Sequence, residues 1–216
     1  MDKALRGFNA FYQWFLRAIG HVDWLGPLAL RIFLAPILML AGLNKLGSID
    51  EVATWFGNPD WGLGLPAPYL MAWLAGLTEL VGGAALLLGL GVRLVAIPLL
   101  VVMAVAAATA HWEYGWHALP EKTLTMPWEW RQDLIEQAVV RKEKATALLK
   151  AHGNYGWLSE AGSFTVLKNG IEFAATYFVM LLALLFSGGG RWVSLDYWLS
   201  RATGHTGTIE VVKPYK

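Results

Sequence analysis

Four long apolar stretches limit the possible folds of this chain more than any other feature of its sequence. They cover residues 24–46, 69–90, 94–112 and 170–190. A helix rises about 1.5 Å per residue, so roughly 20 apolar residues cross the roughly 30 Å hydrocarbon layer of a bilayer. The sequence therefore predicts an all-α protein in which residues 24–198 form a bundle of four transmembrane helices.

The composition agrees with a surface that faces lipid. Hydrophobic residues make up 56% of the 216 residues and charged residues only 15%, with a mean hydropathy of +0.44, whereas about a quarter of an ordinary soluble chain is charged. The chain has no cysteine, which excludes thiol nucleophiles, disulfides and thiolate metal sites within it. The only dense basic cluster, residues 141–144, is interrupted by Glu143, so we exclude nucleic acid as a partner.

The first 23 residues have the pattern of an amphipathic helix at the membrane surface. Their apolar side chains recur at spacings of three and four, which places them on one helical face and leaves Lys3, Arg6 and Arg17 for phosphate head groups. The alternative is a mobile tail. The apolar residues are Phe8, Phe11, Tyr12, Phe15 and Ile19.

The segments between the apolar stretches differ in kind. The segment from Gly47 to Ala67 has the glycines, prolines and acids of an extramembrane loop. Only three residues, 91–93, separate the second and third stretches, which predicts a tight hairpin.

A polar insert, residues 113–169, precedes the fourth stretch. It contains an amphipathic pattern that starts near Pro127 and ends near Gly153. We interpret this helix as a solvated lid on the membrane or bundle surface in preference to a partner-binding helix.

The cations predict the orientation. Lys and Arg gather in the N-terminal segment, in the hairpin at Arg93 and in the tail, residues 199–216, whereas residues 47–67 have none. Because cytoplasmic segments carry the excess of cations, we expect both termini to be cytoplasmic and the insert to lie outside the inner membrane of a bacterium.

Several ionisable or polar side chains fall inside the predicted spans, where each calls for a partner or a function. Counting about 1.5 Å per residue from the helix ends, Arg31 and Glu79 come close enough to form an intramembrane pair. The same count places four others in one polar layer beneath the insert. They are Asn44, Lys45, His111 and Glu172.

Three interpretations of this layer stay open. The first is structural, with paired charges that fix the helix register. The second is a quinone or proton site, because an imidazole beside a carboxylate can bond a quinone carbonyl and exchange its proton near neutral pH. The third is a metal or small-molecule conduit. It would use His111, His117, Glu113 and Glu172, although six residues between the histidines is no recognised ligand spacing.

An ordered set of residues along the chain resembles the DoxX family of small four-helix membrane proteins. The similarity covers about residues 25–112 and 165–198, and the long insert looks like the variant that accompanies biosynthesis of copper-handling modified peptides. The matching residues are Arg31, Gly42, Asn44, Lys45, Gly64, Leu65, Pro66, Glu79, Leu80, Gly82, Gly83, Leu88, Gly89, Arg93, His111, Gly170, Glu172, Gly189, Ser194, Leu195 and Asp196.

The resemblance implies an accessory membrane component in redox or metal-stress physiology, with other membrane or periplasmic proteins as partners. Some relatives look like small subunits of a thiosulfate:quinone oxidoreductase, so the enzyme alternative is a quinone-coupled oxidoreductase subunit with quinone as its cofactor. A transporter of a small peptide or metal is the third candidate. The resemblance carries no catalytic assignment onto Glu79, His111 or Glu172.

Overall fold

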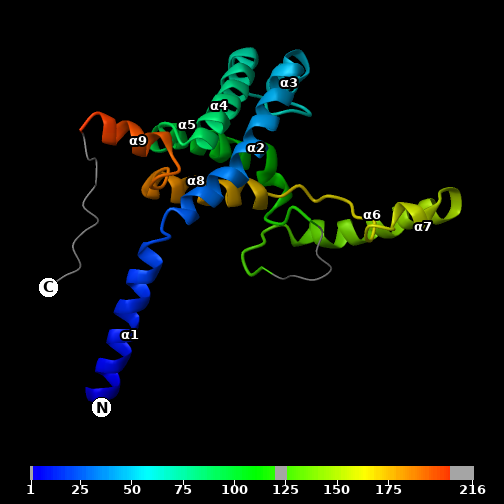
Figure 1. Ribbon diagram of the computed structural model, residues 1–216. Helices are drawn as coiled ribbons and strands as arrows, with labels where there is room; N and C mark the ends of the chain where they lie inside the picture. The colour runs from blue at the N-terminus through cyan, green and yellow to red at the C-terminus, as the bar shows by residue number, and fades with distance from the viewer. Residues whose placement is uncertain (1, 120–125, 205–216) are drawn as a thin grey trace.

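The protein is all-α, as predicted. The computed structural model describes residues 2–119 and 126–204, and within these ranges it contains helices and no β-strand (Figure 1). The predicted tail beyond residue 204 lies outside the described residues.

Within the described ranges, three helical segments are long and apolar enough to cross a membrane. They are α2 (Leu25–Gly47), α4 (Pro68–Leu88) and the continuous segment Val92–Tyr114. The last consists of α5 (Val92–Ala106), a π-helical turn (Ala107–His111) and a 3-10 turn (Trp112–Tyr114). Large apolar side chains on these helices, such as Phe33, Val81 and Val101, are more than half exposed, as expected for surfaces that contact lipid.

The fourth apolar helix, α8 (Glu172–Ser187), is shorter than its predicted range. Its 16 residues extend about 24 Å, less than the roughly 30 Å of the hydrocarbon layer. The backbone turns at both ends, because Asn169 and Gly188 have positive φ angles of 67° and 75°. By length alone α8 does not qualify as a membrane span.

The four apolar helices share one hydrophobic core, to which α2, α4, α5 and α8 all contribute. Helices α2 and α4 run antiparallel in close contact, because Gly42 and Gly83 let the backbones approach. A Cβ on Gly42 would lie 2.5 Å from the backbone nitrogen of Leu80, and one on Gly83 would lie 3.0 Å from the carbonyl oxygen of Ala35. These contacts set the register between the two helices.

Among the helices that were not predicted is one that follows α2 directly. The segment interpreted as a loop, Gly47 to Ala67, begins with α3 (Ile49–Gly57). Its first turn carries Asp50 and Glu51, which stabilise a helix N-terminus, and its Ala53 and Phe56 are buried against Ala72 of α4. Two of the glycines and both prolines follow α3 in the second half of the segment, so the loop prediction was wrong for the first half.

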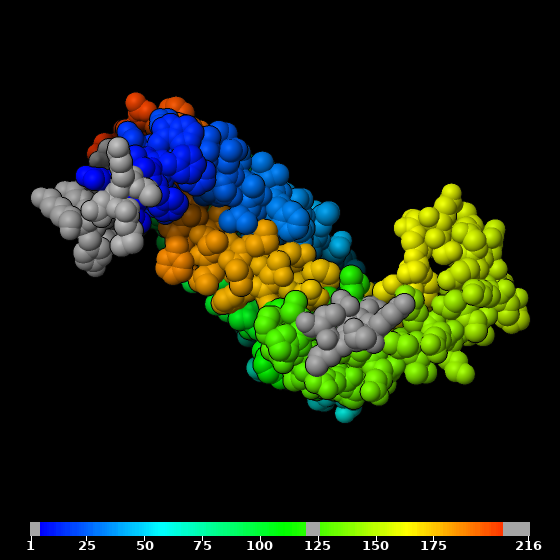
Figure 2. All heavy atoms as spheres, turned by 90° about the horizontal axis from the view of Figure 1, so that it is seen from below, coloured from blue at the N-terminus to red at the C-terminus, as the bar shows by residue number. Residues whose placement is uncertain are grey.

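Two parts of the chain project away from the apolar helices. Helix α1 (Asp2–Gly20) extends from one end of them (Figure 1). From the other end, α6 (Gln132–His152) and α7 (Tyr155–Leu158) form an arm that reaches beyond them (Figures 1 and 2). A helix does lie within the range predicted from Pro127 to Gly153, and Gly153 is its C-cap, but it begins at Gln132 and not near Pro127. It does not cover the apolar helices as a lid would.

Candidate functional site at the insert junction

Arg31 ties three segments together at the end of the apolar helices opposite the insert. Its side chain is buried, with 1% exposure, and its Nε donates to the Leu86 carbonyl at 2.6 Å. Nη2 donates to Leu87 at 2.9 Å, and Nη1 donates to Gly189 at 2.6 Å and Val193 at 3.2 Å. The carbonyls of the last helical turn have no partner within their own helix, so Arg31 caps α4 and fixes the chain that follows α8.

The predicted Arg31–Glu79 pair is therefore wrong. Glu79 is buried and pairs instead with Lys45, whose Nζ lies 2.6 Å from Oε2. The register between α2 and α4 explains why Glu79 pairs with Lys45 and not with Arg31. Gly42 packs against Leu80, which places Arg31 opposite the end of α4, about 15 Å along the axis from Glu79. Lys45 lies one turn beyond the level of Glu79 and reaches back to it.

The other members of the predicted polar layer do not form one group. His111 ends the π-helical turn, and its Nδ1 lies 2.9 Å from the carbonyl oxygen of Asn169. Glu172 Oε2 accepts a hydrogen bond from the Ala118 N–H at 3.0 Å. Asn44 is exposed. Within the described residues no hydrogen bond or ion pair joins the Lys45–Glu79 pair to His111 or Glu172.

A short backbone ladder fastens the two ends of the insert to each other. The N–H groups of Gly170, Ile171 and Glu172 donate to the carbonyls of His117, Gly115 and Trp116 at 3.0, 2.9 and 3.0 Å. Only glycine fits at position 170, because a Cβ there would lie 2.5–2.6 Å from these three carbonyl oxygens. The entry and the exit of the insert therefore meet beside the start of α8.

Beneath this ladder lies a buried charge cluster, Glu129–Lys168–His117, which the sequence did not single out as a group. Lys168 Nζ lies 2.5 Å and His117 Nδ1 2.7 Å from Glu129 Oε2, and the side chains of Glu129 and Lys168 are 0% and 2% exposed. Glu129 also accepts from the backbone N–H of Arg131 at 2.8 Å, of His117 at 3.1 Å and of Trp116 at 3.1 Å.

These donors keep Glu129 charged. Burial raises the pKa of Glu129, but hydrogen bonds from Lys168, Arg131 and His117 outweigh it and hold the pKa well below its ordinary value. One sequence signal could have drawn attention to this carboxylate. Glu129 stands between Trp128 and Trp130 just after Pro127, an apolar setting in which a solvated acid is not expected.

The two histidines considered as weak metal ligands have different partners. His111 contacts the Asn169 carbonyl, whereas His117 contacts Glu129. Across residues 2–119 and 126–204, no three His, Asp or Glu side chains gather closely enough to hold a metal ion. The geometry of these residues thus gives the metal interpretation no support.

The three long apolar helices and their exposed apolar side chains define an all-α membrane protein. Residues 26–112, which contain its first three apolar helices, match the model of the DoxX family. The match confirms the resemblance for this region, which is less than half of the 216 residues. The arm, α8 and α9 (Leu195–Ala202) lie outside it. No curated protein and no solved structure matches the chain.

Proposed function

We propose that this protein is an accessory component of the bacterial inner membrane in redox or metal-stress physiology, and that it presents the arm α6–α7 to a protein partner outside the cytoplasm. One observation carries the proposal. The Glu129–Lys168–His117 cluster anchors the arm at its base, while the arm itself extends beyond the apolar helices. A firmly anchored, projecting helix is suited to holding a partner at a fixed distance from the membrane.

The surface of α6 supports this role. Ile135 and Ala138 are buried near its start, whereas Val140 and Leu148 further along are 53% and 63% exposed. Val140, Lys144 and Leu148 follow at intervals of four, so they share one face. That face offers two aliphatic side chains around a cation to a partner.

The topology in this proposal has α8 as a fourth span and both termini in the cytoplasm. Arg93, Arg191 and Arg201 all line one cavity at the end of the apolar helices opposite the insert, in agreement with the excess of cations expected on the cytoplasmic side. The two acids of α3 lie in the segment that follows the other end of α2. An α8 of about 24 Å would cross if the bilayer thins locally around it.

A genetic test follows from the arm. In the native bacterium, deletion of the gene should lower survival under oxidant or copper challenge, and the wild-type protein should restore it. The double variant Val140→Asp, Leu148→Asp should fail to restore survival at a normal protein level in the membrane. The matched control, Glu136→Gln and Gln137→Glu on the same helix, should restore it. Full rescue by the double aspartate variant would refute partner presentation by α6.

A second candidate is a quinone-coupled oxidoreductase subunit, favoured by the setting of His111. A π-helical turn is often found at functional sites, and this one ends at His111. If the neutral imidazole donates its Nδ1–H to the Asn169 carbonyl, Nε2 is left as an acceptor for a quinol hydroxyl. Purified protein should then bind a ubiquinol or menaquinol analogue, and His111→Ala should weaken that binding. Equal affinity of the wild type and the variant would count against this site.

A further inference from the structure

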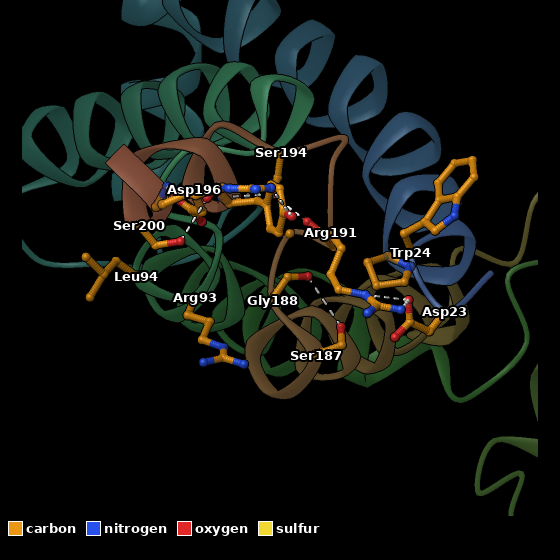
Figure 3. Close-up of a pocket in the computed structure, with 16 residues that line it drawn as sticks. Asp23, Trp24, Arg93, Leu94, Ser187, Gly188, Arg191, Ser194, Asp196 and Ser200 are labelled. Carbon is orange, nitrogen blue, oxygen red and sulfur yellow. Dashed lines mark hydrogen bonds and ion pairs between the residues drawn. The ribbon is translucent and has the colours of Figure 1, made fainter. Parts of the chain in front are cut away.

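A cavity lies at the end of the apolar helices opposite the insert. It has a volume of about 820 Å³. Its walls are the start of α5, the turn Gly188–Gly190 after α8, and α9 (Figure 3). Neither the proposed partner presentation nor the quinone alternative uses this cavity.

The charge around the cavity is positive. Arg93, Arg191 and Arg201 line it together with Asp23 and Asp196. Both aspartates are engaged, since Asp23 pairs with Arg191 at 2.9 Å and Asp196 accepts the N–H groups that begin α5 at 2.6 and 3.0 Å. Within the described residues, neither Arg93 nor Arg201 forms an ion pair with a carboxylate. These two guanidinium groups therefore have charge available for a ligand.

Residues that line the cavity also carry hydrogen-bond donors without a partner. The Arg93 guanidinium lies against Gly188 and donates through Nη2 to the Phe186 carbonyl at 3.1 Å, while its Nε has no partner. In the described part of the chain, the backbone N–H groups of Gly189, Gly190 and Arg191 donate to no backbone carbonyl. Several free N–H groups beside cations suit an anion with several oxygen atoms, and phosphate is the common example.

The surroundings indicate where such a phosphate comes from. Trp24, Pro27 and Leu94 line the same cavity, and Leu94 is 74% exposed at the start of a helix that faces lipid. Tryptophan is enriched at the level of the lipid head groups. A phospholipid bound here would place its phosphate near the arginines and its acyl chains along the apolar surface of α5.

We propose that this cavity binds the head group of an anionic phospholipid, with Arg93 and Arg201 as its charged donors. The net positive charge favours an anionic head group over a zwitterionic one. This assignment depends on the chain being in a membrane. It does not depend on the role proposed for α6, so a failure of either proposal leaves the other standing.

The test uses the full chain, purified and stripped of lipid. Phosphatidylglycerol should bind the wild type more tightly than phosphatidylcholine in native mass spectrometry. Loss of a charged hydrogen bond changes affinity by about tenfold, so we expect Arg93→Gln and Arg201→Gln each to weaken phosphatidylglycerol binding by about that factor. Arg141→Gln, an exposed arginine of α6 outside the cavity, is the matched control and should leave binding unchanged.

Three further measurements decide the assignment. Arg93→Lys, which keeps the charge, should retain more of the binding than Arg93→Gln. Inorganic phosphate at millimolar concentration should neither displace the lipid nor raise the thermal stability, and an equal effect of free phosphate would overturn the lipid assignment. Equal binding of the two phospholipids would also overturn it. Arg201 lies on the surface of α9, so its variant tests the cavity even if Arg93→Gln does not fold.

Discussion

The sharpest prediction concerns the carboxylate beneath the insert. Glu129→Gln removes the negative charge from a side chain that is 0% exposed and leaves Lys168, at 2% exposure, without a counter-ion. Removing one partner of a buried ion pair costs about 3–5 kcal/mol. Because each 1.4 kcal/mol is a factor of ten, the junction at the base of the arm should open at least about 100-fold more often.

Hydrogen exchange measured by mass spectrometry on protein in lipid nanodiscs would detect this opening. The reporters are the amides of Gly170, Ile171 and Glu172, which donate across the junction. They should exchange much faster in Glu129→Gln, while amides in α2 and α4 should keep their protection. Glu136→Gln, an exposed acid on α6, is the matched control. If exchange at the three reporters is unchanged in Glu129→Gln, the cluster does not hold the arm.

The contribution of Glu129 to stability should depend on pH. Its pKa is lowered in the folded protein, so its contribution to stability is complete above the unfolded value of about 4.3 and is lost as the pH falls toward the folded value. The stability difference between the wild type and Glu129→Gln should thus persist from pH 7 to about pH 5 and shrink below about pH 4. Denaturant unfolding of the junction at each pH measures it. A difference that disappears between pH 7 and pH 5 would refute the assignment to Glu129.

Three further variants test the packing of the apolar helices by thermal unfolding in detergent. Arg31→Met should destabilise the protein by about 3 kcal/mol or more, because it leaves several buried carbonyls without donors; an unchanged Tm would show that they find other partners. Glu79→Gln should lower Tm because its lysine partner loses its counter-ion, whereas the exposed Glu51→Gln should not. Gly42→Ala should cost about 1–3 kcal/mol by overpacking, whereas Gly47→Ala, which meets no atom within 4 Å, should be neutral.

Hydropathy and spacing were sufficient to predict the all-α fold and the helix of the insert. They failed where contacts between helices decide the outcome. Arg31 was paired with Glu79 because the depth of each residue in the membrane was counted from the end of its own helix. The true offset depends on how far Gly42 and Gly83 let α2 slide along α4, and spacing within one helix does not contain that information.

The buried cluster escaped prediction for a related reason. Glu129 and Lys168 are 39 residues apart and lie in segments without periodicity, so neither stands out in a sequence that contains 16 acids and 17 cations. The residues that did stand out were conspicuous because they lie in apolar stretches. A charge in an apolar stretch needs a partner because burying it is costly. Its presence there therefore indicates a buried interaction and does not by itself indicate a function.

This distinction changes how loss-of-function variants should be interpreted. Arg31 donates only to backbone carbonyls that hold the helix ends together, so its loss should reduce the amount of folded protein in the membrane. Val140 and Arg201 are exposed and belong to neither hydrophobic core cluster, so their variants should leave that amount unchanged. The activity of an Arg31 variant must therefore be normalised to the amount of protein in the membrane before any loss is assigned to function. A loss of function at Val140 or Arg201, in contrast, reports directly on the arm or on the arginine-lined cavity.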